Sequence, residues 1–507
     1  MLLRLLLAMS LVTLPLSPAM AQAPSARVRT DIGTVSGGIE GDLLVFRGIP
    51  YAAPPVGPLR WKAPQPPLKW TGVRDATKFG FACPQDGAHK EPWAQVGPQS
   101  EDCLFLNVWR PRRAGKYPVM VFIHGGGFTY GAAGVPLYDG AALANRGAVI
   151  VTINYRLGRL GFFAHPALTR EDPAGLLGNY GIMDQIAALK WVKRNIASFG
   201  GDAGNVTIFG ESAGAGSVQI LMGSPASRGL FQKAISESGA GGSVLAPIRG
   251  GKINAEMIGE AWTNSLGLKN AAADQLRAIP LADVVKNGRS FPFLDGKVVV
   301  RSPGDPFYRG EQMKIPLMIG CNSNESSLGG MTEPAAKMLL GDAFGPLLDG
   351  YIAMTGKPHD KAAIDLAEDV GFVLPSFALA DRQAAVNPNT YVYFFDQVPV
   401  DQRAGAAGTD HGGELEYVFG TKPIEHRWDA RDAEVSKLMG DYWVRFAKTG
   451  NPNGGGAPKW PAVTSLPTTY LYVGATTEAR RLAPIQEQAK AAAMTVSINK
   501  WPTITVP

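Results

Sequence analysis

The sequence contains few of the residues that bind metal ions in proteins. It has three cysteines and six histidines among 507 residues. The histidines are scattered along the chain, and none falls in the H-E-x-x-H pattern of zinc hydrolases. We therefore expect neither a metal ion nor an organic cofactor.

Concentrated positive charge is missing as well. No run of lysines and arginines with interleaved aromatic residues occurs, and the formal net charge of +6 is small for a chain of this length. A nucleic-acid-binding protein would carry a basic stripe or patch. The sequence gives no reason to expect a nucleic acid partner.

Long apolar runs do not occur beyond the N-terminus. No later segment reaches the roughly 18 apolar residues that suggest a membrane-spanning helix. The first 23 residues are different. Arg4 precedes an apolar run over residues 5–16, and small residues follow at 19–23. This order is typical of a secretory signal peptide, and the prolines at 15 and 18 argue against a membrane anchor. We expect export to the periplasm or the medium, with no stable membrane insertion of the mature chain.

Three cysteines in an exported protein suggest one disulfide and one remaining thiol. Cys83 and Cys103 are the natural pair, because they bracket a segment rich in proline and glycine that a bridge would close into a loop. Cys321 lies in or just after an apolar strand and is expected to be a buried free thiol.

The pattern of apolar residues predicts an α/β fold. Most of the predicted strands are continuously apolar, as strands covered on both faces are, and they lie at 107–109, 118–124, 148–154, 205–209, 233–236, 317–320 and 391–395. Apolar residues at steps of three and four over 182–199 predict an amphipathic helix between two of these strands. Strand, helix, strand in this order indicates a largely parallel sheet flanked by helices.

Two segments, near 240–310 and 330–385, show weaker periodicity. We interpret them as helical insertions over the carboxyl edge of the sheet, where ligand sites of open α/β sheets lie. Because there are no internal repeats and no low-complexity linker, residues 24–507 are predicted to form a single catalytic domain.

The segment Gly210-Glu211-Ser212-Ala213-Gly214 is the most informative motif. A serine at the centre of G-x-S-x-G, after a strand and before a helix, is the nucleophile elbow of α/β-hydrolases. The glycines are required because the serine lies on a strained turn where helix and strand cross closely. Ser212 is therefore the predicted nucleophile.

A serine nucleophile needs a histidine base and a carboxylate that orients the base. His411 lies between glycines on a loop ahead of an apolar run, late in the chain. Glu325 follows the predicted strand at 317–320, which gives the order serine, acid, histidine of this fold. Asp410 is adjacent to His411 and is expected to cap the loop instead.

An oxyanion hole is predicted from His124-Gly125-Gly126-Gly127. Glycines let the backbone turn its N–H groups toward the oxygen on which negative charge develops. Gly126 and Gly127, together with Ala213 after the nucleophile, are the expected donors. The segment lacks the spacing of a phosphate-binding loop or a dinucleotide fingerprint.

With these residues in place, the sequence resembles the type-B carboxylesterase family, which includes cholinesterases and related lipases. Residues 199–214 are similar to that family's serine-region signature, and residues 101–111 are similar to its second signature. Further matches occur at 46–52, 154–158, 179–185 and around His411. The resemblance implies an α/β-hydrolase fold, hydrolysis of carboxylic esters and a triad of Ser212, Glu325 and His411.

Some positions allow more than one interpretation. Trp93 resembles the tryptophan with which cholinesterases bind quaternary ammonium groups, but packing under the disulfide is favoured, so choline esters are not predicted. Phe291 and Phe293 are candidates for the acyl pocket, with core packing an equal alternative. Glu211 is expected to be buried and hydrogen-bonded, supporting the elbow.

The sequence thus predicts a serine carboxylesterase that hydrolyses small-molecule esters through an acyl-enzyme. Two alternatives stay open: transfer of the acyl group to another alcohol or amine by the same triad, and a binding protein built on the hydrolase scaffold. The oligomeric state does not follow from the sequence.

Overall fold

The computed structural model describes residues 26–86, 95–172, 175, 177–422, 426–464 and 466–500. The predicted signal peptide, residues 1–23, and Trp93 lie outside the described residues. No helix within these ranges is long and apolar enough to cross a membrane.

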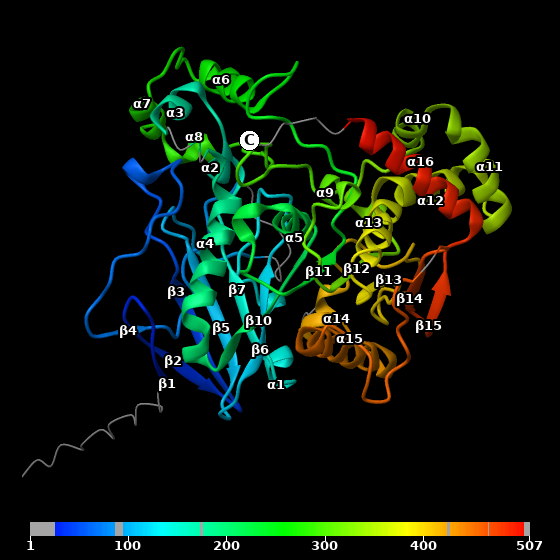
Figure 1. Cartoon of the computed structure of the whole chain (residues 1–507), viewed down its shortest axis with the longest axis horizontal. Coiled ribbons are helices and arrows are strands. Elements are labelled where there is room, and N and C mark those ends of the chain that lie inside the picture. The colour runs from blue at the N-terminus through cyan, green and yellow to red at the C-terminus, as the bar shows by residue number, and fades with distance from the viewer. Residues whose placement is uncertain are drawn as a thin grey trace, which may run out of the picture.

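A mixed sheet of thirteen strands runs through the molecule (Figure 1). Its order is β1-β2-β3-β5-β7-β6-β10-β11-β12-β13-β14-β15, with β4 beside β2. The strands are β1 (Ala26–Arg29), β2 (Thr34–Glu40), β3 (Leu43–Pro50), β4 (Val73–Asp75), β5 (Phe105–Pro111), β6 (Tyr117–Ile123), β7 (Val149–Ile153), β10 (Gly201–Glu211), β11 (Lys233–Glu237), β12 (Leu317–Asn322), β13 (Thr390–Phe395), β14 (Thr469–Val473) and β15 (Thr477–Arg481). The short strands β8 (Phe162–Phe163) and β9 (Gly178–Asn179) pair separately.

The centre of the sheet is parallel, as the sequence predicts. Strands β7, β6, β10, β11, β12, β13 and β14 pair in parallel with one another, in this order. The N-terminal strands β1, β2, β3 and β5 pair antiparallel, and β15 does the same at the other edge. All seven predicted strands are present, whereas most of the antiparallel edge strands are not predicted by the apolar pattern.

Each face of the sheet buries its own apolar core. Val119, Val121 and Ile123 of β6 belong to one cluster, and Met120 and Phe122 belong to the other. Side chains of a strand alternate between its two faces, so both faces are covered. This explains why the central strands are apolar throughout.

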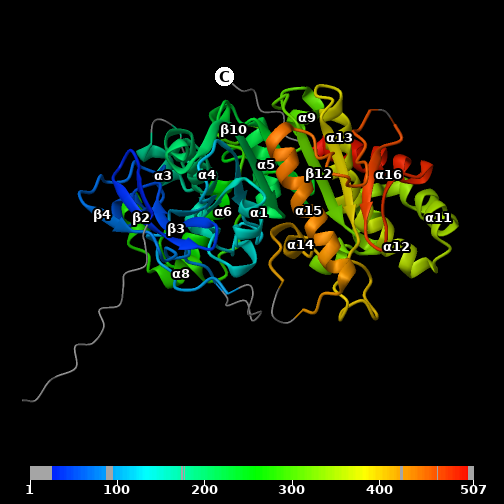
Figure 2. The same ribbon diagram turned by 90° about the horizontal axis from the view of Figure 1, so that it is seen from below.

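Helices cover the two faces. The predicted amphipathic helix is α4 (Tyr180–Asn195), which continues as a 3₁₀ turn (Ile196–Phe199) and packs in the first cluster with α5 (Ala213–Gly223). The opposite face is covered by α1 (Ala141–Asn145), α14 (Leu415–Phe419) and α15 (Ala430–Thr449) (Figure 2).

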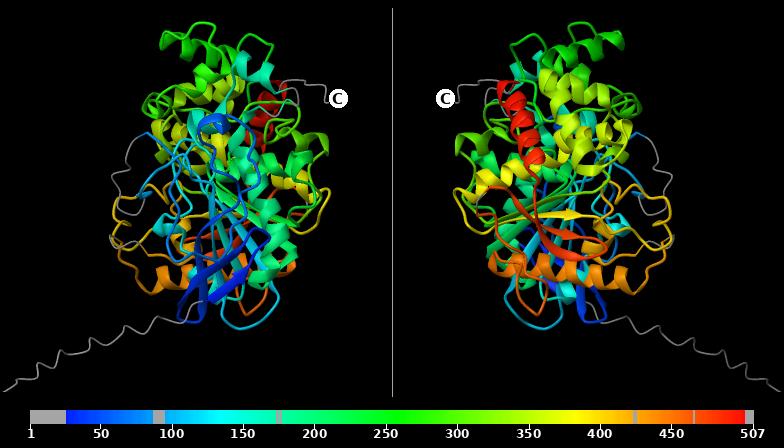
Figure 3. Two further views of the ribbon diagram at one scale, coloured as in Figure 1. Left: turned by 90° about the vertical axis from the view of Figure 1, so that its left-hand side faces the viewer. Right: turned by 90° about the vertical axis from the view of Figure 1, so that its right-hand side faces the viewer.

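Short helices fill both segments in which insertions are expected. Residues 240–310 contain α6 (Ala255–Ser265), α7 (Ala273–Arg277), α8 (Leu281–Val285) and α9 (Asp305–Arg309). Residues 330–385 contain α10 (Glu333–Leu340), α11 (Phe344–Thr355), α12 (His359–Glu368), a π-helical turn (Asp369–Val373) and α13 (Leu374–Ala384). Most of these helices lie on the side of the sheet away from α15, together with α2 (Gly158–Gly161), α3 (Pro166–Glu171) and the C-terminal helix α16 (Pro484–Lys500) (Figure 3).

The cysteines pair as predicted. Cys83 and Cys103 form a disulfide, and Cys321 is a buried free thiol on β12.

One buried ion pair fixes the chain after β7 against α4. The guanidinium of Arg156 donates from Nε and Nη2 to the two oxygens of Asp184, at 2.8 and 2.7 Å. The backbone N–H of Arg156 donates to the same carboxylate at 3.0 Å. Both side chains are almost completely buried. Removing one partner of such a pair leaves an uncompensated buried charge.

We therefore predict that Asp184→Asn lowers the free energy of unfolding by about 3–5 kcal/mol. The matched control is Asp31→Asn, which removes the carboxylate of the exposed Arg194–Asp31 pair and should change stability by less than about 1 kcal/mol. Urea unfolding of both variants measures the difference. Equal stabilities would show that the buried pair does not hold this junction.

Candidate active site

The predicted functional residues come together at the carboxyl edge of the parallel strands. The glycine loop follows β6, Ser212 follows β10, Glu325 follows β12, and His411 lies on the loop between β13 and α14. Because β6, β10, β11, β12 and β13 are parallel neighbours, these segments meet in space although they are far apart in the sequence. This edge is where open α/β sheets bind ligands.

Ser212 occupies a strained turn between β10 and α5. Its φ of 56° lies in the left-handed region, which non-glycine residues rarely adopt. The backbone N–H of Ser212 donates to the carbonyl oxygen of Glu237 at 2.9 Å, which ties the turn to the neighbouring strand β11. The turn projects Ser212 into the cavity described below.

The glycines on either side of the turn allow strand and helix to touch. A Cβ on Gly214 would lie 1.9 Å from the carbonyl oxygen of Ile123, and one on Gly210 would lie 2.6 Å from the same atom. The predicted reason for both glycines is therefore confirmed: the last residue of β6 packs against both of them.

Glu325 and His411 are in direct contact. The two atoms His411 Nδ1 and Glu325 Oε2 are 2.5 Å apart. The other carboxylate oxygen of Glu325 accepts from Ser238 Oγ at 2.6 Å and from the N–H of Asn322 at 2.8 Å. Glu325 has no exposed surface. The carboxylate is thus held in a fixed orientation with one oxygen aimed at the imidazole.

Further hydrogen bonds join the loop that carries Glu325 to the loop that carries His411. Asn324 donates from its N–H to the carbonyl oxygen of Thr409 at 2.9 Å and from Nδ2 to the carboxylate of Asp410 at 2.6 Å. The N–H of His411 donates to Ser327 Oγ at 2.9 Å. Asp410 therefore binds the loop that carries Glu325, in line with its expected role as a loop residue.

Two residues that contact Glu325 were not singled out by the sequence motifs. Ser238 lies directly after β11, and Glu368 ends α12 in the second helical segment. The carboxylate of Glu368 accepts from the backbone N–H groups of Glu325 and Ser326. No short motif links these residues to Glu325, because they come from other parts of the chain.

Nε2 of His411 is directed at Glu211. The distance from Nε2 to Glu211 Oε1 is 3.0 Å, but neither atom has a hydrogen-bond partner among the residues that the structure describes. Glu211 is buried as predicted. The expectation that it is hydrogen-bonded fails at Oε1, which has no hydrogen-bond partner among the described residues.

The carboxylates around His411 control its charge. Burial lowers the pKa of the imidazole, but Glu211, Glu325 and Glu414 outweigh burial and raise this pKa to about 9. Burial in turn raises the pKa of Glu211 to about 7 and that of Glu414 to about 8. The site therefore favours the imidazolium form of His411 at neutral pH.

The glycine loop after β6 contains two successive residues with positive φ. Gly126 has a φ of 94° and Gly127 a φ of 59°. Within the described ranges, neither glycine donates its N–H to another backbone or side-chain acceptor. Ala213 is the first residue of α5, where N–H groups have no partner within the helix. The neighbouring His124 is buried, and burial lowers the pKa of its imidazole to about 4.

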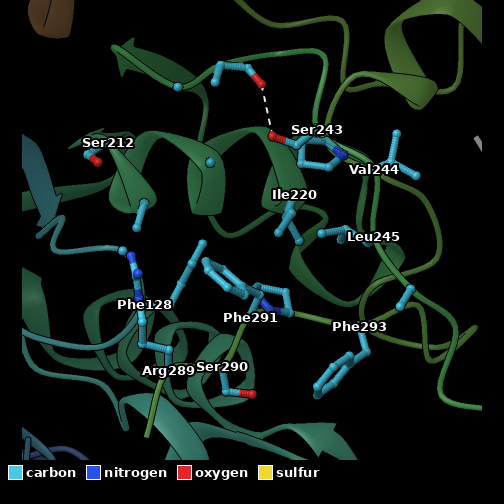
Figure 4. Close-up of a pocket in the computed structure, with 18 of the residues that line it drawn as sticks. Phe128, Ser212, Ile220, Ser243, Val244, Leu245, Arg289, Ser290, Phe291 and Phe293 are labelled. Carbon is cyan, nitrogen blue, oxygen red and sulfur yellow. Dashed lines mark hydrogen bonds between the residues drawn. The ribbon is translucent and has the colours of Figure 1, made fainter. Parts of the chain in front are cut away.

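Ser212 opens into a cavity of about 600 Å³. Gly127, Phe128, Ala213, Phe291 and Phe293 line it together with Ser212 (Figure 4). Phe291 is 51% exposed, whereas Phe293 is buried. The cavity thus contains both predicted acyl-pocket residues, and Arg289 is among the lining residues that the sequence did not single out.

No group of three or more histidine, cysteine, aspartate or glutamate residues that could hold a metal ion occurs among the described residues.

The fold and the position of Ser212 define an α/β-hydrolase. Solved structures agree: a PNB esterase has a TM-score of 0.78 with 35% identity, and a thermophilic PNB esterase has a TM-score of 0.79 with 34% identity. Each comparison covers 92% of this chain and 99% of the other.

The chain belongs to the carboxylesterase family, whose sequence model matches residues 24–340 and 349–495. It is 37% identical to the fumonisin B1 esterase of Sphingopyxis macrogoltabida, over 88% of this chain and 86% of that protein. It is 37% identical to the para-nitrobenzyl esterase of Bacillus subtilis, over 86% and 92%. Liver carboxylesterase 1 of Oryctolagus cuniculus is 34% identical over 87% of both chains. The protein is a carboxylic ester hydrolase.

The close packing at the turn generates a prediction about stability. Gly214→Ala should lower the free energy of unfolding by about 2–4 kcal/mol, because its Cβ would collide with the backbone of β6. The matched control is Gly216→Ala on the same helix, where the nearest atom lies 3.7 Å away in the Phe128 ring. That variant should keep or slightly raise stability, since alanine favours helices. Urea unfolding distinguishes them, and equal losses in both variants would contradict the packing argument.

Proposed function

We propose that this esterase acts through an acyl-enzyme formed on Ser212, with His411 as general base and Glu325 as the residue that orients it. The observation that carries the proposal is the 2.5 Å contact between His411 Nδ1 and the fully buried Glu325. This contact fixes the imidazole at the same strand edge as Ser212. The fold order of serine, acid and histidine supports the same assignment.

In the proposed reaction Ser212 Oγ attacks the ester carbonyl while His411 Nε2 accepts its proton. In the free protein Nε2 lies 3.0 Å from Glu211 Oε1, so its hydrogen bond with the serine hydroxyl is proposed to form when substrate binds. Catalytic hydrogen bonds of free enzymes often tighten only when substrate binds. Glu325 stabilises the imidazolium, which then protonates the departing alcohol, and water activated by His411 releases the acid.

The oxyanion of the tetrahedral intermediate is proposed to bind the N–H groups of Gly126, Gly127 and Ala213. Their support is the left-handed turn of the two glycines and the position of Ala213 at the start of α5. Such donors are typically worth roughly 3 kcal/mol each to the transition state.

We also propose a role for the N-terminal segment and a domain organisation for the rest of the chain. Residues 1–23 are proposed to direct export, which the Cys83–Cys103 disulfide supports because such bonds persist in oxidising compartments. Residues 24–507 are proposed to form one catalytic domain in which the two helical segments are insertions that shape the cavity. Phe291 and Phe293 would then lie on the acyl side of Ser212.

The direct test is hydrolysis of p-nitrophenyl acetate and longer p-nitrophenyl esters by the mature protein. Ser212→Ala should abolish turnover, and Glu325→Gln should lower it by about 10³–10⁴-fold, with both variants as resistant to urea as the unmodified protein. Undiminished turnover in Glu325→Gln would mean that another carboxylate orients His411. Product analysis with a competing alcohol separates hydrolysis from acyl transfer.

The pH dependence tests the role of Glu211. A histidine base must be neutral, so activity is lost as the pH falls through its pKa. Because the neighbouring carboxylates raise the pKa of His411 to about 9, the acid limb of kcat/KM should lie above the ordinary value of about 6.5. The sequence alone would place it near pH 6.

Glu211→Gln removes one of the negative charges that raise this pKa, so the acid limb should move to lower pH. The measurement is the pH profile of kcat/KM for a neutral ester in both proteins. An acid limb that stays at the same pH in the variant would show that Glu211 does not set the charge of His411.

A further inference from the structure

The cavity beside Ser212 has one unusual wall residue. Its lining is largely apolar, with Phe128, Ile220, Val244, Leu245 and Phe372 among the side chains. Arg289 is the only charged residue among the described residues that line it. A cation in an ester-binding cavity needs a role, because apolar walls give it no partner.

Arg289 has no carboxylate partner among the residues that the structure describes. It lies on the loop after α8 and is exposed, and it takes part in no salt bridge with any residue of the described ranges. Many other arginines of this chain pair with acids, Arg60 with Glu101 and Arg277 with Glu171 among them. The guanidinium of Arg289 is therefore available to a ligand.

The position of Arg289 relates it to the reacting ester. Its side chain extends along the side of the cavity on which Phe128 and Ser212 lie (Figure 4). Burial and the charge of Glu211 raise the pKa of Tyr130, next to the glycine loop, and the Arg289 cation opposes that rise. The charge of Arg289 thus acts on a residue next to the glycine loop. Arg289 also lies two residues before Phe291 on the same segment.

We propose that Arg289 binds a free carboxylate on the acyl part of the substrate, so that the preferred esters are half-esters of dicarboxylic or polycarboxylic acids. This inference rests on the proposed function, because it assumes that Ser212 attacks the ester and that the segment of Phe291 and Phe293 contacts the acyl chain. A guanidinium matches a carboxylate with two parallel N–H donors. Because Arg289 is exposed, added salt should screen this attraction.

The test uses two esters that differ at the distal carboxyl group, which is free and charged in mono(4-nitrophenyl) adipate and methylated and neutral in methyl 4-nitrophenyl adipate. Release of nitrophenol, corrected for spontaneous hydrolysis, gives kcat/KM for each ester, and the ratio of charged to neutral ester is the readout. The ratio should fall about tenfold in Arg289→Gln, as expected for loss of one charge-assisted hydrogen-bonded pair. Arg289→Lys should retain part of it, because the charge remains without the two parallel donors.

Lys286→Gln is the matched control, since Lys286 is an exposed cation on the same segment that does not line the cavity. Its ratio should equal that of the unmodified protein. Added salt should lower the ratio in the unmodified protein and in Arg289→Lys but not in Arg289→Gln.

The outcomes separate this inference from the proposed function. An unmodified protein that hydrolyses both esters, with a ratio unchanged in Arg289→Gln, would overturn the role of Arg289 and leave the esterase mechanism intact. Equal losses for the charged and neutral esters would overturn it too, because Arg289 would then act on the carbonyl or on the fold. If the unmodified protein hydrolysed neither these esters nor p-nitrophenyl acetate, both proposals would fail together.

Discussion

The contact between Glu325 and His411 is the interaction on which the rest of the site depends. It joins the loop after β12 to the loop after β13. The carboxylate of Glu325 accepts from Ser238 Oγ and from the N–H of Asn322, and the backbone N–H of Glu325 donates to Glu368. A buried carboxylate is costly unless its oxygens are fully hydrogen-bonded, and these contacts meet that requirement while aiming one oxygen at the imidazole.

The same contacts explain why the parallel strands matter for function. Neighbouring strands β10, β11 and β12 deliver Ser212, Ser238 and Glu325 to one edge of the sheet. Gly210 of β10 and Gly214 of α5 both lie against the last residue of β6. This close packing sets the position of Ser212 between them. The geometry of the site is therefore a property of the sheet and its crossings rather than of any single loop.

Buried carboxyl groups outside the triad also act on the charge of His411. Glu211 and Glu414 are both buried near the imidazole, and burial raises the pKa of each carboxyl group. Their charges in turn favour the imidazolium. Such an arrangement helps to stabilise the positive charge that His411 gains when it accepts a proton, at the expense of the neutral form that begins the reaction.

Much of this account follows from the sequence, and the limits have physical reasons. The central strands, α4, the disulfide and the strand-turn-helix around Ser212 are encoded in local patterns of apolar residues, cysteine and glycine. The edge strands are missed because their apolar pattern is interrupted or exposed: β2 includes two glycines, β3 includes Arg47 and Gly48, and β15 is largely exposed. Ser238, Glu368 and Arg289 are missed because their roles arise from contacts between segments distant in sequence. The raised pKa of His411 depends on three carboxylates from separate segments, and no motif reports it. Trp93 stays a prediction.

The central claim is that Ser212 carries the acyl group, and covalent labelling tests it most directly. The mature protein would be treated with diethyl 4-nitrophenyl phosphate and digested, and the modified peptide would be identified by mass spectrometry. The account predicts one diethylphosphoryl group per chain, on Ser212, formed in proportion to the loss of esterase activity. Loss of activity with the label on another residue, or with Ser212 unmodified, would contradict it.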